Sequence, residues 1–210
     1  GPSMVIYCLA VSFAAIDWVM TLDPHWFSTI YGLLFLVGWG LSSYCFVVIV
    51  LAYLSDKAPT DAFIGKRHFH DLGKLMLALV MVWTYFNFSQ FLIIWAGNIP
   101  EETGWLLTRM KGGWGWIGAF LIFFHFAFPF LILLHQDLKR HAWRIAAVAL
   151  FVLVMRWFDM FFLIGPNPRI NPMGMEQGAF YMNWMDIVAP IGIGGLWLWM
   201  FFTQLRQRPL

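Results

Sequence analysis

The chain has 210 residues, of which 61% are hydrophobic and 11% are charged, and its mean hydropathy is +0.72. A soluble domain carries about 25% charged residues, so this composition excludes an ordinary water-soluble fold and indicates a protein whose surface faces lipid. The formal net charge of +2 is uninformative by itself, and we expect no nucleic-acid partner.

The apolar residues gather in long uninterrupted segments. Spanning a bilayer takes about 20 apolar residues in helical form. Six segments meet this requirement, at about 3–22, 29–54, 72–95, 114–134, 143–164 and 187–205. The sequence therefore predicts an all-α, polytopic transmembrane helix bundle with about six spans, forming a single domain over residues 1–210. Residue 1 is Gly and an apolar run follows within three residues, so we expect a fragment of a longer chain.

Basic residues indicate the orientation, because loops rich in Lys and Arg stay on the cytoplasmic side. We call side B the end that holds the connections near 55–71 and 135–144 and the C-terminal end, and side A the opposite end. Side B carries nine cations: Lys57, Lys66, Arg67, Lys74, Lys139, Arg140, Arg144, Arg206 and Arg208. Side A carries Arg109, Lys111 and Arg169, and its acids are Asp23, Glu101, Glu102, Glu176 and Asp186. Side B is therefore predicted to be cytoplasmic, and the side A acids either face a basic partner or are solvated loop charges.

Signals for bound metals and for common catalytic sites are missing. The two cysteines, Cys8 and Cys45, lie in apolar segments and are expected to be small buried hydrophobes rather than ligands. The chain has no phosphate-binding glycine loop, nucleophile elbow or zinc motif. Only His125 is clearly at membrane depth, so haem held by two histidines is not expected here. We assign no catalytic residue and no metal ligand to the chain.

Charged residues at membrane depth are expensive and usually have a partner or a function. Asp17 lies in the last turns of the first span, where it either reaches interfacial water or is a protonatable group in a pathway. Arg156 and Asp159 are three residues apart on the fifth span, so they share one helix face. That pair is either a structural ion pair or a functional one, and its burial is expensive to maintain.

A second polar group stands where side B meets the third span, at His68, His70, Asp71 and Lys74. Either it is an interfacial collar, with Asp71 favoured near a helix N-terminus, or it is a proton entrance, because histidine titrates near neutrality. Two histidines at spacing i, i+2 do not share a helix face, which disfavours a metal site.

Further polar side chains follow along the third span and within the fourth. Thr84, Tyr85, Asn87, Ser89 and Gln90 either join helices by hydrogen bonds or line a water chain or a quinone site. His125 precedes Pro129 by one turn, and proline leaves backbone carbonyls free in a kinked helix. His125 is either a core histidine bonded to a neighbouring helix or a ligand-binding or proton-relay group.

Several blocks of the sequence resemble a known family. They are residues 12–29, 68–75, 88–91 leading into 94–103, and, less specifically, 156–159 and the basic C-terminal end. Together they resemble the ActF subunits of bacterial alternative complex III, members of the NrfD-like integral membrane family. Members of this family have about ten helices, so the resemblance implies that six spans make up a C-terminal fragment of a longer NrfD-like subunit.

The resemblance implies a role in the bacterial inner membrane, in a complex that oxidises quinol and passes electrons to a periplasmic acceptor. Partners would be an ActC-like relative, a multihaem cytochrome c and iron–sulfur subunits, with haem c and the clusters outside this chain. Membrane lipid is expected as a further partner. ActF-type subunits are credited with quinone binding and a proton pathway, so quinone or quinol is the one cofactor that this chain would bind. The quinol site nearest the iron–sulfur chain is usually credited to the ActC-type subunit.

Residue by residue, the resemblance and the cost of burial select the same proton-pathway candidates: Asp17, His70, Asp71, Lys74, His125, Arg156 and Asp159. Candidates for quinone binding are Tyr85, Ser89 and His125. The hypothesis is that His70 and Asp71 form a cytoplasmic entrance, that Asp17 and Asp159 relay protons, and that Arg156 tunes Asp159. The alternatives are a scaffold subunit that moves no protons and a stand-alone secondary transporter, although no internal repeat is visible.

Overall fold

The structure, a computed structural model, describes residues 1–58, 60–167 and 180–207. Within this part the chain is all-α, and six helical segments are long and apolar enough to cross a membrane, which confirms the predicted fold class. They are α1 (Pro2–Trp18, extended by η1, Met20–Leu22), α2 (Tyr31–Leu54), α3 (Lys66–Gly97), the rod Trp114–Leu134, α8 (Ala142–Ile164) and α9 (Met185–Gln207). Of the loop charges considered above, Arg169, Glu176 and Arg208 lie outside the described residues.

The helix ends agree with the predicted spans except at the start of α3. This helix begins at Lys66 rather than near residue 72, because the Gly65 N–H donates to Nδ1 of His68 at 3.1 Å and caps the extra turn. At the other end, Asn98 adopts a left-handed conformation with φ 48°, which asparagine tolerates. Pro100 then starts the short helix α4 (Pro100–Met110), at a position where proline loses no helical hydrogen bond.

The rod Trp114–Leu134 is one helical column in three parts. These are α5 (Trp114–Leu121), the π-helical segment η3 (Ile122–Ala127) and α6 (Phe128–Leu134). Two short elements complete the described chain, η2 (Thr60–Ala62) and α7 (Gln136–Lys139).

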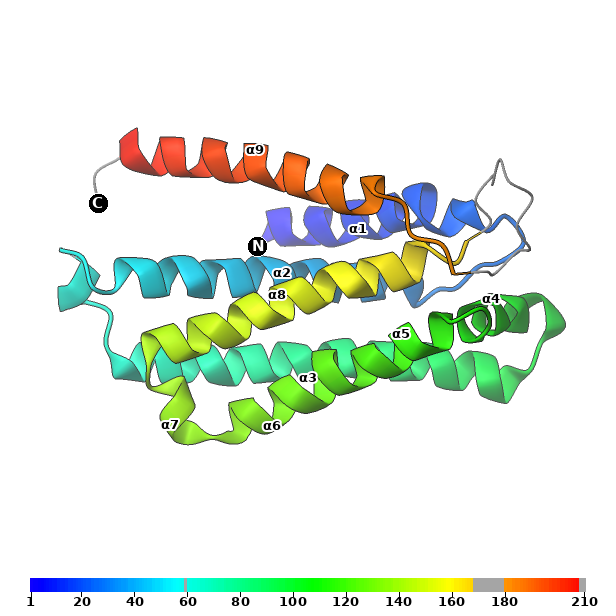
Figure 1. Ribbon diagram of the computed structural model, residues 1–210, viewed down its shortest axis with the longest axis horizontal. Coiled ribbons are helices and arrows are strands. Elements are labelled where there is room, and N and C mark those ends of the chain that lie inside the picture. Colours follow the sequence, from blue (N-terminus) through cyan, green and yellow to red (C-terminus); the bar gives the residue numbers. More distant parts are fainter. Residues whose placement is uncertain (59, 168–179, 208–210) are drawn as a thin grey trace.

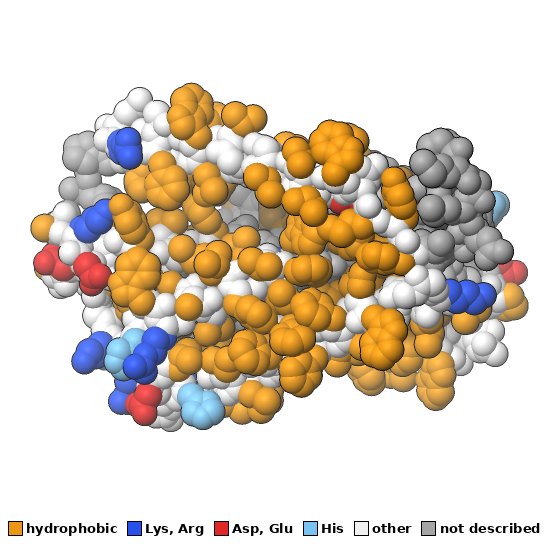
Figure 2. Space-filling view, viewed as in Figure 1, with side chains coloured by type: hydrophobic (Ala, Val, Ile, Leu, Met, Phe, Trp, Pro, Cys, Tyr) orange, Lys and Arg blue, Asp and Glu red, His pale blue; other side chains and the backbone are white. Residues whose placement is uncertain are grey.

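The spanning segments run lengthwise in one bundle, with α4 at one end and η2 and α7 at the other (Figure 1). Helix α2 is central and packs against α1, α3 and α8. Figure 2 shows Lys and Arg side chains gathered mainly at the end that holds η2 and α7, which is side B. Apolar side chains cover the length between the two ends, as expected of a surface that meets lipid.

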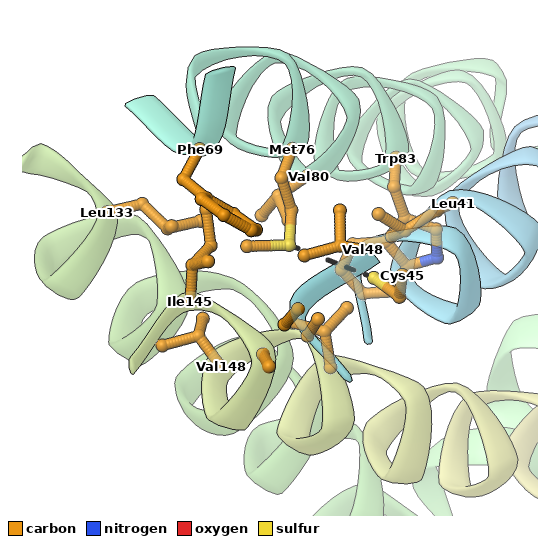
Figure 3. Close-up of a cluster of buried hydrophobic side chains, with 14 residues drawn as sticks. Leu41, Cys45, Val48, Phe69, Met76, Val80, Trp83, Leu133, Ile145 and Val148 are labelled. Atoms are coloured by element: carbon orange, nitrogen blue, oxygen red, sulfur yellow. Dashed lines mark hydrogen bonds between the residues drawn. The ribbon is translucent and has the colours of Figure 1, made fainter. Parts of the chain in front are cut away.

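The half of the bundle nearer side B has an apolar core. Leu41, Cys45 and Val48 of α2 meet Met76 and Val80 of α3, and side chains of α6 and α8 close the cluster (Figure 3). The Cys45 thiol is free and lies 3.9 Å from the Met76 sulfur. The prediction of a buried cysteine is confirmed for Cys45, whereas Cys8 is only half-buried.

A second, aromatic cluster fills the half nearer side A. Trp26 stacks on Trp105 of α4 with ring centroids 4.6 Å apart, and Tyr31 meets the edge of Trp26 at 5.2 Å. Stacked and edge-to-face rings each add to the stabilisation from burial. The cluster fixes α4 against the bundle, and this position of α4 decides what lies beside the buried charges of α8.

Candidate functional site

The predicted pair on α8 forms and is enclosed by the bundle. Asp159 is 1% exposed and Arg156 is 4% exposed. Nη1 of Arg156 donates to Oδ2 of Asp159, and Nε1 of Trp83 on α3 donates to the same oxygen at 3.0 Å. No described residue donates to Oδ1, and Nε and Nη2 of Arg156 have no described partner. The charges therefore neutralise each other while leaving hydrogen-bonding capacity unused.

Helix α2 makes room for this pair at a glycine. A Cβ atom at Gly38 would overlap the guanidinium of Arg156. Since α2 and α8 pack directly, only a residue without a side chain lets the guanidinium lie between them. Gly38 is therefore part of the site.

His125 is a further buried titratable group near the pair, because its ring packs on Trp83. It is fully buried in η3, and its ring lies over that of Trp83 with centroids 3.8 Å apart. Neither ring nitrogen has a partner among the described residues, so the alternative of a core histidine bonded to a neighbouring helix is not observed there. Pro129 in the next turn removes one backbone donor, and π-helical turns are frequent at functional sites.

A cavity of about 580 Å³ adjoins Asp159 and lies between α3, α4, α5 and α8. Its lining is mostly apolar, and its polar members besides Asp159 include Thr84, Asn87 and Gln90 of α3. Lining residues on the outer faces of α3 and η3 are exposed on the apolar flank: Phe88, Phe91 and Ile122. The cavity therefore opens toward the surface that meets lipid.

The polar groups of α3 in this wall are partly engaged within the chain. Thr84 Oγ1 donates to the Val80 carbonyl at 2.8 Å, and Asn87 Nδ2 donates to the Trp83 carbonyl at 3.0 Å. Gln90 Oε1 accepts from the Ser28 hydroxyl at 2.6 Å, which leaves its amide as a donor. The wall combines a large apolar area with a few polar groups, which is typical of sites for small molecules.

Arg109 completes the wall, although its place between two predicted spans suggested a loop charge. It is 2% exposed. Its Nη2 donates to the Leu163 carbonyl at 2.6 Å and to Asn167 Oδ1 at 3.1 Å, and its guanidinium lies over the Trp105 ring at 3.7 Å. Burial lowers the pKa of Arg109 to about 10, an effect opposed by Tyr31 and Asp23, so the side chain is charged at neutral pH. The signal in the sequence was the spacing i, i+4 of Trp105 and Arg109 on a short amphipathic helix.

Three other candidates lie away from the cavity. Tyr85 is 65% exposed on the outer surface of α3, and Ser89 is half-buried. Neither lines the cavity, so the structure does not bring the quinone-binding candidates Tyr85, Ser89 and His125 together. The side chain of Asp17 is exposed on α1, and its backbone carbonyl accepts from the Thr21 hydroxyl at 2.6 Å.

The polar group at side B forms a separate site. Asp71 and Lys74 make an exposed ion pair at 3.5 Å. His70 is half-buried, and its Nδ1 has no described partner. His70 and Trp83 are thirteen residues apart on α3, or about 20 Å along a helix. The apolar core of Figure 3 fills that interval, so no chain of described polar side chains joins the two sites.

Lys139, counted above among the side B cations, is buried rather than solvated. Its aliphatic stem packs against Gly73, where an added Cβ would lie 2.6 Å from Lys139 Cγ. Burial and then the nearby Lys74 lower the pKa of Lys139.

Fold and site together define a multi-pass α-helical membrane protein with a buried ion pair beside a cavity open to its apolar flank. No protein-family model matches the chain, and no curated protein matches it significantly. Any more particular function therefore has to be argued from the site and from the sequence blocks described above.

Proposed function

We propose that this chain is part of a membrane subunit of a quinol-oxidising respiratory complex, of the alternative complex III type, in the bacterial inner membrane. In this proposal it belongs to a longer NrfD-like, ActF-type subunit, binds quinol in the cavity beside α8 and takes up a proton at Asp159. Haem c and iron–sulfur clusters in partner subunits, including a multihaem cytochrome c, carry the electrons. The sequence blocks at 12–29, 68–75 and 94–103 support the assignment.

One observation carries the role of Asp159. Its Oδ2 accepts from both Arg156 and Trp83, which fixes the position of the carboxylate. Its Oδ1 receives no hydrogen bond from a described residue, and the carboxylate lines the cavity. An occupant with a hydroxyl group can therefore donate to a carboxylate that is already held in place.

The chemistry of quinol fits this arrangement. Oxidation removes two electrons and two protons, and the electrons leave to a cluster of a partner subunit. One O–H bond of the quinol breaks and a new O–H bond forms on Asp159, while the second proton passes to water as the second electron leaves. The large apolar lining accommodates the ring and the start of an isoprenoid tail, with Gln90 as a donor to a quinone carbonyl.

The position of Asp159 along α8 indicates the direction of release. Asp159 is five residues from the end of α8 at Ile164, or about 8 Å along the helix, and that end is on side A. The apolar core separates it from His70 and Asp71 on side B. We therefore propose release toward side A, so the hypothesis of a cytoplasmic entrance at His70 and Asp71 is not needed for this step.

The first experiment is gentle purification from native membranes, with mass spectrometry of the co-eluting subunits and a haem c spectrum. Recovery with multihaem cytochrome and iron–sulfur subunits in constant ratio is the expected result. Recovery of the protein alone, without haem or iron, would overturn the assignment and favour a stand-alone transporter.

The second experiment replaces Asp159 by Asn in the intact complex, with Asp61→Asn as the control. Asp61 is an exposed carboxylate in η2, so its replacement changes the charge equally outside the cavity. Asp159→Asn is expected to reduce quinol oxidation and proton release by at least about 100-fold, the usual contribution of a positioned base. Because the variant leaves Arg156 uncompensated and is expected to be less stable, rates are compared per assembled complex, counted by its haem c. Full activity of the assembled variant would instead favour a scaffold role.

A further inference from the structure

A second pocket, on side B, has a lining that differs from that of the cavity beside α8. It has a volume of about 440 Å³ and lies between the end of α2, the start of α3 and the start of α8. Three cations line it: Lys66, Arg140 and Arg144. Asp56 is the one carboxylate in its lining. Cations therefore outnumber carboxylates three to one around a concave surface.

These cations are weakly compensated within the described part of the chain. Arg140 Nη1 is 4.0 Å from Asp137 Oδ1, at the limit of an ion pair, and no described carboxylate reaches Lys66 or Arg144. Asp56 is engaged by a neutral donor, because Trp143 Nε1 lies 3.3 Å from its Oδ2. The pocket therefore keeps an excess of positive charge, which attracts an anion.

The backbone at the start of α8 adds to this charge. Helix α8 begins at Ala142, and the side chain of its N-cap residue His141 makes no capping hydrogen bond. Nδ1 of His141 lies instead 2.8 Å from the Asp137 carbonyl. The first N–H groups of α8 consequently have no side-chain acceptor, and they lie beside the three cations. Free N–H groups next to positive charge form a favourable site for a phosphate group.

The pocket continues into a surface for acyl chains. Trp143 lines the pocket and is exposed, as indole rings at a membrane interface commonly are. Leu150 and Val154 follow Trp143 by seven and eleven residues, so they lie on the same face of α8, and both are exposed. A molecule with a phosphate in the pocket can thus extend its tail about 16 Å along this face.

We propose that this side B pocket binds the phosphate of an anionic phospholipid, with Lys66, Arg140 and Arg144 around the headgroup and the acyl chain along Trp143, Leu150 and Val154. Basic pockets between transmembrane helices are a general means of recognising anionic headgroups. The site is about a helix length from the cavity at Asp159 and does not depend on the function proposed for that cavity.

The test uses the intact protein in nanodiscs of phosphatidylcholine, with phosphatidylglycerol titrated in and inorganic phosphate as a separate arm. The variant is Lys66→Gln with Arg144→Gln. The control is Lys57→Gln with Arg206→Gln, which removes the same charge on side B outside the pocket. Readouts are the phosphatidylglycerol retained after detergent extraction and the rise in Tm that it produces.

The expected result is that the pocket variant binds phosphatidylglycerol about 30-fold more weakly, the effect of losing two interfacial cations. The control pair should bind as the original protein does, and inorganic phosphate alone should not raise Tm. Equal weakening in both pairs would overturn the proposal by showing a diffuse surface effect. Stabilisation by inorganic phosphate would overturn the lipid assignment in favour of a soluble phosphate. If both variants have the Tm of the original protein in pure phosphatidylcholine, neither is misfolded.

Discussion

Helices α8 and α9 have the same length and opposite surroundings. Each has 23 residues and is apolar enough to span a membrane. Helix α8 buries ten residues inside the bundle, including Arg156 and Asp159, whereas α9 buries none. Trp197 and Phe201 of α9 contact the ring of Phe46, and the Asp186 carbonyl accepts from Nε1 of Trp157 at 3.3 Å. Figure 1 shows α9 along one side of the bundle.

The difference explains where charge can be placed in this protein. The charges of α9 are Asp186 in its first turn and Arg206 in its last, with none between them. A charge in the middle of a helix surrounded by lipid would lack partners. Helix α8 carries two charges near its side A end because neighbouring helices supply Trp83 as a donor and Gly38 as space. In these two helices, charges within the span occur only where other helices enclose them.

The largest effect is expected from removing one member of the buried pair. Arg156→Ala leaves the Asp159 carboxylate uncompensated and should lower the free energy of unfolding by about 3–5 kcal/mol. Thermal unfolding in detergent or nanodiscs measures the change. The double variant Arg156→Met with Asp159→Leu should recover most of the loss, because it removes both charges. A double variant as unstable as the single one would show that the charges contribute little.

A smaller effect is expected at the donor on α3. Trp83→Phe keeps the ring over His125 but removes the hydrogen bond to Asp159, and hydrogen bonds to charged groups are worth about 1.5–3 kcal/mol. Its Tm should fall by less than that of Arg156→Ala. In a chain that already carries Asp159→Leu, Trp83→Phe should lower Tm much less, because the acceptor of the hydrogen bond is then absent. If the two substitutions instead lower Tm additively, Trp83 and Asp159 are not coupled.

The space at Gly38 can be tested against a matched glycine two residues away. Gly38→Ala places a methyl group against the Arg156 guanidinium and should destabilise by about 1–3 kcal/mol. A Cβ atom added at Gly40 would have no other heavy atom within 4 Å. Gly40→Ala should therefore be neutral or stabilise the protein by about 0.5–1 kcal/mol. Equal effects on Tm would mean that α2 and α8 can shift apart without loss.

The smallest effects compare the two helices directly. Ile145→Val in α8 removes a methyl group from a site that is 0% exposed, and should cost about 0.5–1.5 kcal/mol. Ile193→Val in α9, at a site 72% exposed, should change stability by less than about 0.5 kcal/mol. A loss at Ile193 as large as that at Ile145, measured on the isolated protein, would break the comparison. A loss seen only in an assembled complex would instead show that a partner covers α9.

Much of the fold followed from local pattern. All six spans were predicted, since length and hydropathy are properties of a segment itself. The start of α3 was placed six residues late, because Lys66–Asp71 is polar and continues the helix only through the cap between Gly65 and His68. At the site, the pairing of Arg156 with Asp159 was predicted because i, i+3 spacing fixes it within one helix.

The residues that surround the pair could not be predicted in this way. The contributions of Trp83 and Gly38 depend on how α3 and α2 are rotated against α8, which no single segment specifies. Arg109 resembled a loop charge because its burial comes from stacking on Trp105 and from carbonyls at the end of α8. Tyr85 and Ser89 were selected by residue type, but rotation of α3 turns Thr84, Asn87 and Gln90 to the cavity instead.

The sequence by itself determined that this protein is a membrane bundle with six spans, a basic end and an ion pair on its fifth span. These properties depend on segment composition and on spacing within one helix. Only the tertiary structure decided that the pair is enclosed while α9 is not, and that a cavity and a buried Arg109 lie beside Asp159. In lipid the hydrophobic effect does not select which apolar face meets another helix. That choice depends on the packing of small residues, rings and hydrogen bonds between segments far apart in the chain.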